Sequence, residues 1–147
     1  MSNKLELMWY GKEKEIHVEP RLLIERSELS NTEAAPDTEN MLIHGDNLLA
    51  LKALESRYAG QVKCIYIDPP YNTGAKDWKY NNDYVDGNDV YRHSKWLSMM
   101  NVRLQTAKKL LNPENSVLIC TIDEKEYTRL GCLLEELFPT SSIQMIT

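Results

Sequence analysis

Short apolar runs alternate with helical repeats along most of the chain, from residue 41 onward. Three runs, at 41–45, 62–67 and 116–122, have the length and apolar composition of buried strands, and a fourth begins at 141–147. The segments between them carry apolar residues at three- and four-residue spacing, which predicts one face of a helix. These residues are Leu48, Leu51, Leu54 and Tyr58; Leu97, Met100, Leu104, Ala107 and Leu111; and Tyr127, Leu130, Leu134 and Leu137.

This order of elements predicts an α/β fold, in which parallel strands form a sheet and helices flank its faces. The 62–67 run, VKCIYI, is apolar on both faces, as is typical of a central parallel strand. Asp123 and Glu126 predict a capping box at the start of the last helix. Ligands of such sheets bind at the carboxyl ends of strands, where Gly45-Asp46 and Asp68–Tyr71 are both expected.

Two segments show no sustained period. Residues 1–40 hold two short candidate strands, at 5–11 and 21–25, and then a polar stretch with a proline. We expect this part to be an arm and linker, with the domain proper at 41–147. Residues 72–90 are rich in glycine, asparagine and aspartate and predict a long loop, of a length that is usually functional or mobile.

The composition is that of a single domain with a core, because 42% of the 147 residues are hydrophobic. No stretch is long and apolar enough to span a bilayer, and the charged N-terminus lacks the apolar region of a secretory signal. We therefore expect a cytoplasmic protein without a membrane partner. The net charge of −5 argues against a chain that binds nucleic acid on its own, although nine of the 22 acidic residues lie in residues 1–40.

The cysteines and histidines do not predict a metal site. Cys64, Cys120 and Cys132 are odd in number and lack the paired spacing of a zinc site, so we expect reduced thiols in the core. His44 lies in a predicted strand and is expected to be a buried core residue. His93 has no cysteine or carboxylate at metal-binding spacing.

The run IYIDPPYNTG, residues 65–74, places a carboxylate and an aromatic ring at the end of a predicted strand. Pro69 and Pro70 fix their own φ angles and favour an extended conformation before them, so Asp68 and Tyr71 are held with little freedom. Neither proline has an N–H. The Asp68 carboxylate and the Pro69 carbonyl thus form a pair of acceptors for an amino group with two hydrogens. A turn with a purely structural role is the alternative.

Such an acceptor pair suits the exocyclic amine of a nucleobase, which is a poor nucleophile because its lone pair is conjugated with the ring. Two acceptors favour a pyramidal nitrogen and stabilise the charge that develops as it attacks an electrophile. Tyr71 offers a face on which an extruded base can stack, a contact worth roughly 1–3 kcal/mol. The aromatic residues of the predicted loop could line or cover that base pocket, or lack order without DNA. They are Trp78, Tyr80 and Tyr84.

With the segments around it, this run resembles the β class of amino-methylating DNA methyltransferases. The supporting segments are LIHGDNLLALKAL before it and Trp96, LLNPENSVLICTIDEKEY and LLEELF after it. The similarity extends in order and spacing from about Met41 to the end of the chain, and it is greatest to the modification (Mod) subunits of type III restriction–modification systems. LELMWYGK and PRLLIE in the arm are also similar to that family.

The resemblance implies a Rossmann-like methyltransferase fold that uses S-adenosylmethionine to methylate adenine in double-stranded DNA, with the target base flipped. It also implies a possible restriction subunit as partner. Asp68, Pro69, Pro70 and Tyr71 fall on the family's catalytic motif. Asp46 falls on an earlier motif, where it could contact the adenosine part of the donor, but an aspartate there is also a good helix N-cap.

Family members carry a glycine-rich donor motif after the catalytic motif, whereas the six glycines of this sequence are not clustered. We therefore expect an N-terminal fragment of a longer enzyme, with an incomplete methyltransferase domain at 41–147 that binds the donor weakly and is inactive alone. An open sheet edge would then favour a homodimer. The alternatives are methylation of the cytosine amino group and a non-catalytic interaction module.

A basic stripe without any acidic residue lies between Tyr91 and Pro113. Arg92 and Arg103 fall on one side of the helix predicted there and could contact DNA phosphates. The alternative is that the stripe is an ordinary solvated helix face. Its members are Arg92, Lys95, Arg103, Lys108 and Lys109.

Overall fold

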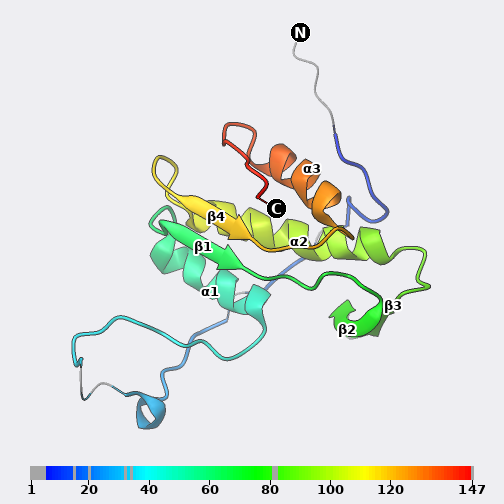
Figure 1. The fold of residues 1–147 in the computed structure, drawn as a ribbon. Helices are drawn as coiled ribbons and strands as arrows, with labels where there is room; N and C mark the ends of the chain where they lie inside the picture. Colours follow the sequence, from blue (N-terminus) through cyan, green and yellow to red (C-terminus); the bar gives the residue numbers. More distant parts are fainter. Residues whose placement is uncertain are drawn as a thin grey trace.

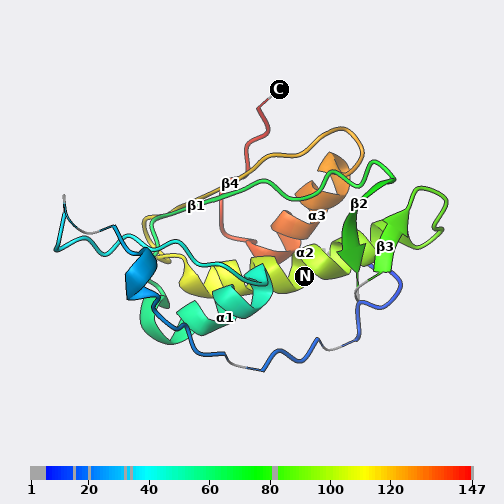
Figure 2. The ribbon, with the colours of Figure 1, turned by 90° about the horizontal axis from the view of Figure 1, so that it is seen from below.

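Two parallel strands and three helices form the centre of the protein in a computed structural model, which describes residues 6–14, 16–19, 21–31, 33, 35–80 and 83–146. The strands are β1 (Cys64–Ile67) and β4 (Val117–Cys120), and the helices are α1 (Asn47–Tyr58), α2 (Arg92–Leu110) and α3 (Tyr127–Leu137). All three helices lie on the same side of the strand pair (Figure 2). The predicted α/β fold with parallel strands and flanking helices is thus confirmed.

Outside this centre, β2 (Ala75–Tyr80) and β3 (Asp83–Asp86) form a separate antiparallel pair near the start of α2 (Figure 1). A short 3-10 turn, Ser27–Leu29, lies in the N-terminal arm. Among the described residues, none of the helices combines the length and the apolar character needed to cross a membrane.

The strand pair is covered on one face. Ile65 lies opposite Leu118 on the half-buried face, towards the helices. Tyr66 lies opposite Ile119 on the other face, and 64% of Tyr66 is exposed. The expectation that the strand at 62–67 is buried on both faces is therefore wrong for this structure, because the described helices pack against one side only.

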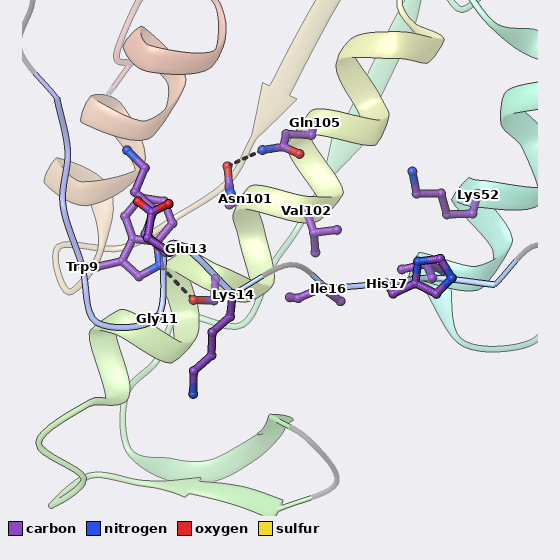
Figure 3. A pocket seen from close by; sticks show the side chains of 13 residues that line it. Trp9, Gly11, Glu13, Lys14, Ile16, His17, Lys52, Asn101, Val102 and Gln105 are labelled. Carbon is purple, nitrogen blue, oxygen red and sulfur yellow. Dashed lines mark hydrogen bonds between the residues drawn. The ribbon is translucent and has the colours of Figure 1, made fainter.

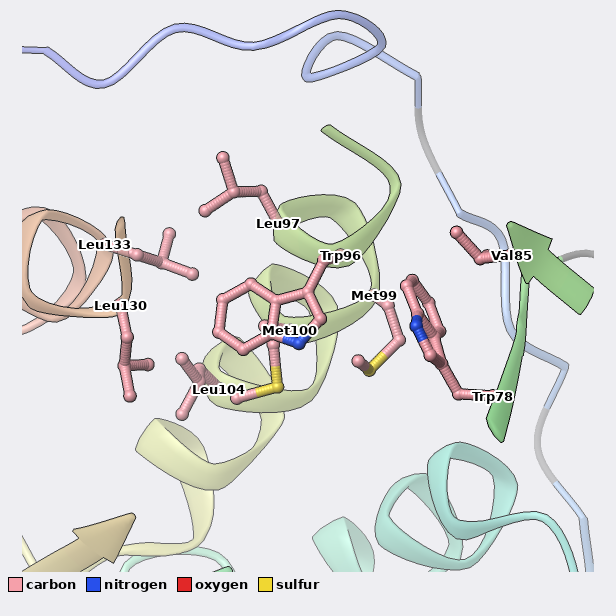
Figure 4. Packing of buried hydrophobic residues seen from close by; sticks show 9 residues of the cluster. All are labelled: Trp78, Val85, Trp96, Leu97, Met99, Met100, Leu104, Leu130 and Leu133. Carbon is pink, nitrogen blue, oxygen red and sulfur yellow. The ribbon is translucent and has the colours of Figure 1, made fainter. Parts of the chain in front are cut away.

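The hydrophobic core is centred on α2, where Trp96, Met100 and Leu104 are at most 1% exposed. The face predicted from the leucine spacing is the face that is buried, so this prediction is confirmed. Residues of α3 pack on one side of α2 and residues of the β2–β3 hairpin on the other (Figure 4). Burial of each large apolar side chain contributes roughly 1.5–3 kcal/mol. The remaining members of the cluster are Leu97, Met99, Leu130, Leu133, Trp78 and Val85.

Two predicted strands, at 41–45 and 141–147, do not form in residues 41–45 and 141–146. Leu42 is 99% exposed and Ile146 is 92% exposed, so neither run is buried. A parallel strand needs a neighbour for its ladder of hydrogen bonds, and β1 and β4 pair only with each other in the described chain. An apolar run without such a neighbour stays irregular.

Within the described part of 72–90, β2 and β3 pair antiparallel, so this segment is not the long loop that was predicted. Gly74 and Gly87 approach closely at its open end, where a Cβ on Gly74 would lie 2.6 Å from the Gly87 Cα. Lys79 lies over the ring of its cross-strand partner Tyr84, 4.5 Å from the ring centroid. The prediction failed because the strands are short and polar, so they carry no alternating apolar pattern.

The N-terminal arm is anchored to the domain near its start. The Trp9 indole Nε1 donates a hydrogen bond of 2.8 Å to Ser98 Oγ on α2. The strands expected at 5–11 and 21–25 do not form in the parts of these segments that the structure describes. The described residues between 21 and 40 are all exposed, Leu22 to 91%, so this described part of the arm is not buried against the domain. The domain boundary at residue 40 stays a prediction.

Candidate active site

The DPPY residues lie where β1 and β4 end side by side. Asp68 directly follows β1, and Thr121 directly follows β4. Because the two strands are parallel, their carboxyl ends meet, and Thr121 Oγ1 donates a hydrogen bond of 2.5 Å to Asp68 Oδ1. Asp68 is exposed, so its carboxylate is open to solvent while it accepts this hydrogen bond from Thr121. Thr121 was not anticipated from the sequence.

The two proline carbonyls have different surroundings. The Pro70 carbonyl accepts a hydrogen bond of 2.7 Å from the indole Nε1 of Trp96, whose side chain is completely buried in α2. No described residue donates a hydrogen bond to the Pro69 carbonyl. The expected pairing of a free Pro69 carbonyl with the Asp68 carboxylate is therefore compatible with the geometry.

The Tyr71 side chain lies beside the Asp68 carboxylate, and 37% of the residue is exposed. A hydrogen bond to Asp68 raises the pKa of the Tyr71 phenol above its ordinary value, against an opposing contribution from Thr121. The phenol thus joins Asp68 and Thr121 at the strand ends. The residue is partly exposed to solvent, and the carboxylate that it adjoins accepts a hydrogen bond from Thr121.

Asn72, the residue after DPPY, is 1% exposed and has a positive φ of 58°. Asparagine is one of the few residues that adopt this left-handed conformation without large strain. Its Nδ2 donates a hydrogen bond to Glu126 Oε1, and its Oδ1 accepts one of 3.3 Å from the Trp78 indole. The chain that leaves the DPPY motif is thereby fixed at a single orientation.

Glu126 does not form the predicted capping box. α3 begins at Tyr127, and the Asp123 side chain accepts instead from the Lys125 N–H within its own turn. Glu126 is fully buried, and its Oε1 accepts hydrogen bonds from Asn72 and from His93 Nδ1. The D-x-x-E spacing predicted a local contact with the helix start for this glutamate, so its contacts with Asn72 and His93 were not expected.

The two arginines predicted to contact DNA both make intramolecular hydrogen bonds, Arg92 at the start of α2 and Arg103 in its second half. Arg92 Nη1 donates to the Gly87 carbonyl at 2.6 Å. Arg103 Nε donates to Asn47 Oδ1 at 2.8 Å, and burial lowers the pKa of its guanidinium against the opposing charge of Asp46.

The other basic residues of the stripe also have partners within the protein. These contacts are Lys95 with Asp89, Lys108 with the Leu137 carbonyl, and Lys109 with Glu55. Such contacts favour a structural role for the stripe as a whole.

Asp46 caps α1, with its Oδ1 accepting from the backbone N–H groups of Leu48 at 2.9 Å and Leu49 at 3.1 Å. This is the N-cap role that the sequence offered as the alternative to cofactor binding. No described residue makes a hydrogen bond to its Oδ2. Figure 1 places the start of α1 at the same end of the molecule as the arrowhead of β1, so Asp46 and the DPPY motif share one end of the domain.

Two of the three cysteines are not in the core. Cys64 and Cys132 are exposed free thiols, which corrects the expectation of burial. Burial and the charge of Asp68 raise the pKa of the Cys120 thiol to about 11, so this thiol responds to the charge of Asp68.

His44 is exposed and outside any strand, so its predicted core position is wrong. Within the described residues, no three His, Cys, Asp or Glu side chains are grouped as a metal site requires.

A separate groove of about 480 Å³ lies between the N-terminal arm and α2 (Figure 3). Its lining is mainly polar and includes Trp9, Lys14 and Gln105. None of the DPPY residues lines it. The groove is therefore distinct from the DPPY residues at the strand ends.

The chain has clear relatives among known proteins. The DNA methylase family profile matches residues 62–147. The probable type III restriction-modification enzyme HindVI Mod subunit of Haemophilus influenzae is 43% identical, over 68% of this chain and 12% of that protein.

Two further relatives match a larger share of this chain. The type III restriction-modification enzyme EcoPI Mod subunit of Escherichia phage P1 is 33% identical over 90% of this chain and 24% of that protein. The type II methyltransferase M.KpnI of Klebsiella pneumoniae is 32% identical over 76% of this chain and 27% of that protein. The matched region thus spans about a quarter of these two relatives and a smaller share of the HindVI subunit.

Proposed function

Because the chain belongs to the DNA methylase family, we propose that the protein methylates the exocyclic amino group of adenine in DNA. The similarity to Mod subunits supports a place in a restriction–modification system, with a restriction subunit as a possible partner. The observation that carries the proposal is the pairing of an oriented, exposed Asp68 carboxylate with the unoccupied Pro69 carbonyl at the carboxyl end of β1.

In this proposal the two acceptors take the two hydrogens of the adenine amino group. They draw its lone pair out of conjugation and stabilise positive charge on nitrogen as the new N–C bond forms. As the new bond forms, the bond between the methyl group and its donor breaks with its electron pair staying on the donor, and the nitrogen then loses one amino proton to water. Tyr71 stacks on the flipped base and keeps its hydroxyl hydrogen-bonded to Asp68, so both residues of the motif are held in one geometry.

S-adenosylmethionine, when bound, supplies the electrophilic methyl group. The donor set of the chain fits such a ligand in part: Asp46 and Asp68 are exposed carboxylates at the same end of the domain, and both attract a cationic molecule with ribose hydroxyls. Asp46 would use its Oδ2, since its Oδ1 caps α1. Its place in the donor site is a proposal.

Contacts of Arg92 and Arg103 with DNA phosphates are also proposals. The Arg92 guanidinium donates to the carbonyl of Gly87, the residue directly after β3. Arg103 is bound to Asn47 at the start of α1. An arginine has five N–H donors, so each can keep its intramolecular bond and still bind a phosphate oxygen.

The test is a methylation assay on unmodified genomic DNA with labelled S-adenosylmethionine, followed by identification of the modified nucleoside by mass spectrometry. The assay uses the natural protein at its full length. We expect N6-methyladenine from it and none from its Asp68→Asn variant, with Asp37→Asn as an exposed control that loses the same charge. N4-methylcytosine would establish the cytosine alternative. A folded full-length protein that modifies neither base would refute the proposal and favour the non-catalytic module, whereas the 147-residue chain alone is expected to be inactive.

A further inference from the structure

Glu126 is a buried carboxylate that the proposed methyl transfer does not use directly. It is completely inaccessible to solvent, and a buried charge without partners is strongly unfavourable. Three residues are partners of the Glu126 carboxylate. Its Oε1 accepts hydrogen bonds from Asn72 and His93, and its Oε2 lies 3.4 Å from Arg129 Nη1. Only the bond to Asn72 leads back to the DPPY motif.

The hydrogen-bond pattern assigns the tautomer of His93. Arg92 Nε donates to His93 Nε2 at 3.2 Å, so Nε2 is the acceptor nitrogen and Nδ1 carries the proton donated to Glu126. A continuous set of bonds therefore links Arg92, His93, Glu126 and Asn72. This set joins the start of α2 and the turn before α3 to the residue that follows Tyr71.

Asn72 is the point at which this set of bonds acts on the motif. Its backbone is in the left-handed region, and its side chain is bound at both ends, to Glu126 and to Trp78. Since Asn72 follows Tyr71 directly, its orientation determines the direction in which the chain leaves Tyr71. Without the bond to Glu126, the peptide after Tyr71 could rotate and carry the ring with it.

We propose that Glu126 is a positioning residue, which acts through Asn72 to hold the Tyr71 ring where an extruded base stacks. The part that concerns the base rests on the proposed function. Glu126 touches neither the base nor the methyl donor. Its removal acts on the methylation step, because a displacement of about 1 Å in a stacking or reacting group can lower a rate by roughly a hundredfold.

Kinetics distinguish this role from a general contribution to folding. We expect Glu126→Ala to lower kcat for methylation by tenfold or more, with the KM for S-adenosylmethionine unchanged. Glu126→Gln keeps a carbonyl acceptor for Asn72 and is expected to recover most of kcat. Glu124→Ala removes an equal charge from the same turn, where the side chain is 77% exposed, and is expected to behave as the natural protein.

Asn72→Gly removes the bond between Asn72 and Glu126 from the other side and leaves Glu126 in place. It tests the proposal even if Glu126→Ala does not fold. Glycine accepts the positive φ, so only the side-chain bonds are lost. We expect the same loss of kcat as in Glu126→Ala. The double variant should lose no more than either single variant, because both break one link. Natural kcat in Asn72→Gly, or multiplied losses in the double variant, would overturn the proposal.

A readout that needs no activity comes from the three tryptophan indole N–H groups, each of which donates to a different partner. In nuclear magnetic resonance spectra, Glu126→Gln and Glu126→Ala should shift the Trp78 resonance, more in Ala, and leave that of Trp9 in place. An unchanged Trp78 resonance in folded Glu126→Ala would overturn the link. If the natural protein methylates no DNA, the proposed function fails, while these resonances still decide whether Glu126 positions Asn72.

Discussion

The indole Nε1 of Trp96 donates a hydrogen bond of 2.7 Å to the carbonyl oxygen of Pro70, 26 residues earlier in the chain. Trp96 is completely buried at the centre of the core, whereas Pro70 belongs to the DPPY motif, in which Asp68 and Tyr71 are exposed. This bond therefore connects the motif directly to the buried core. It also selects which proline carbonyl stays available, since Pro70 is occupied and Pro69 is not.

Trp96→Phe removes this bond while keeping most of the aromatic ring. We expect a loss of unfolding free energy of about 1–3 kcal/mol and a larger proportional loss of methylation, because the Pro70 carbonyl is released. Urea unfolding and methylation kinetics measure the two effects. Trp9→Phe is the matched control: its indole also bonds to α2, at Ser98, but away from the motif. Equal losses of activity in both variants would contradict the prediction.

Tyr71→Ala should lower methylation by the value of a stacking contact, roughly 1–3 kcal/mol in transition-state free energy. Tyr71→Phe keeps the ring and should retain most of the activity, although it loses the hydroxyl bond to Asp68. Steady-state kinetics with both variants check this. Equal losses would show that the phenol, through its contact with the carboxylate, matters more than the ring face.

Cys120 should be alkylated slowly at neutral pH, because burial first and the Asp68 charge second raise its thiol pKa from 9.0 to about 11. The raised value means that folding favours the protonated thiol. This stabilisation is present below pH 9 and is lost as pH rises towards 11. Alkylation followed by mass spectrometry should find Cys64 and Cys132 modified first, and Cys120 only as the pH approaches 11.

The same measurement locates the Asp68 charge. Asp68→Asn should move the alkylation of Cys120 to lower pH, while the exposed control Asp37→Asn leaves it unchanged. An identical pH profile in Asp68→Asn would mean that the carboxylate does not lie close to Cys120.

Gly74→Ala should destabilise the hairpin by about 1–3 kcal/mol, since an added Cβ would lie 2.6 Å from the Gly87 Cα and φ is +89°. The Trp78 side chain, now buried, should become more accessible to a fluorescence quencher. Gly131→Ala provides the opposite control, because Gly131 lies in α3 with open space around it. There we expect stabilisation of up to about 1 kcal/mol, as alanine is the better helix former. Urea unfolding of both variants measures the difference.

Local patterns were sufficient for the helices, the parallel strand pair and the position of the DPPY motif. The three- and four-residue spacing in α2 identified the side that is buried, because a helix repeats its contacts with the core at that period. The apolar runs at 62–67 and 116–122 became β1 and β4, and the carboxylate of Asp68 lies at the strand end as expected. Each of these features depends on residues close together in sequence.

The partners of the motif could not be read from the chain, because they come from residues far apart in sequence. Thr121 lies 53 residues from Asp68, and Glu126 lies 54 residues from Asn72. Neither contact has a periodicity, and for Glu126 a plausible local role as a helix cap concealed it. Such contacts exist only after α2 and α3 pack on the strand pair, so the geometry that holds the motif depends on tertiary packing.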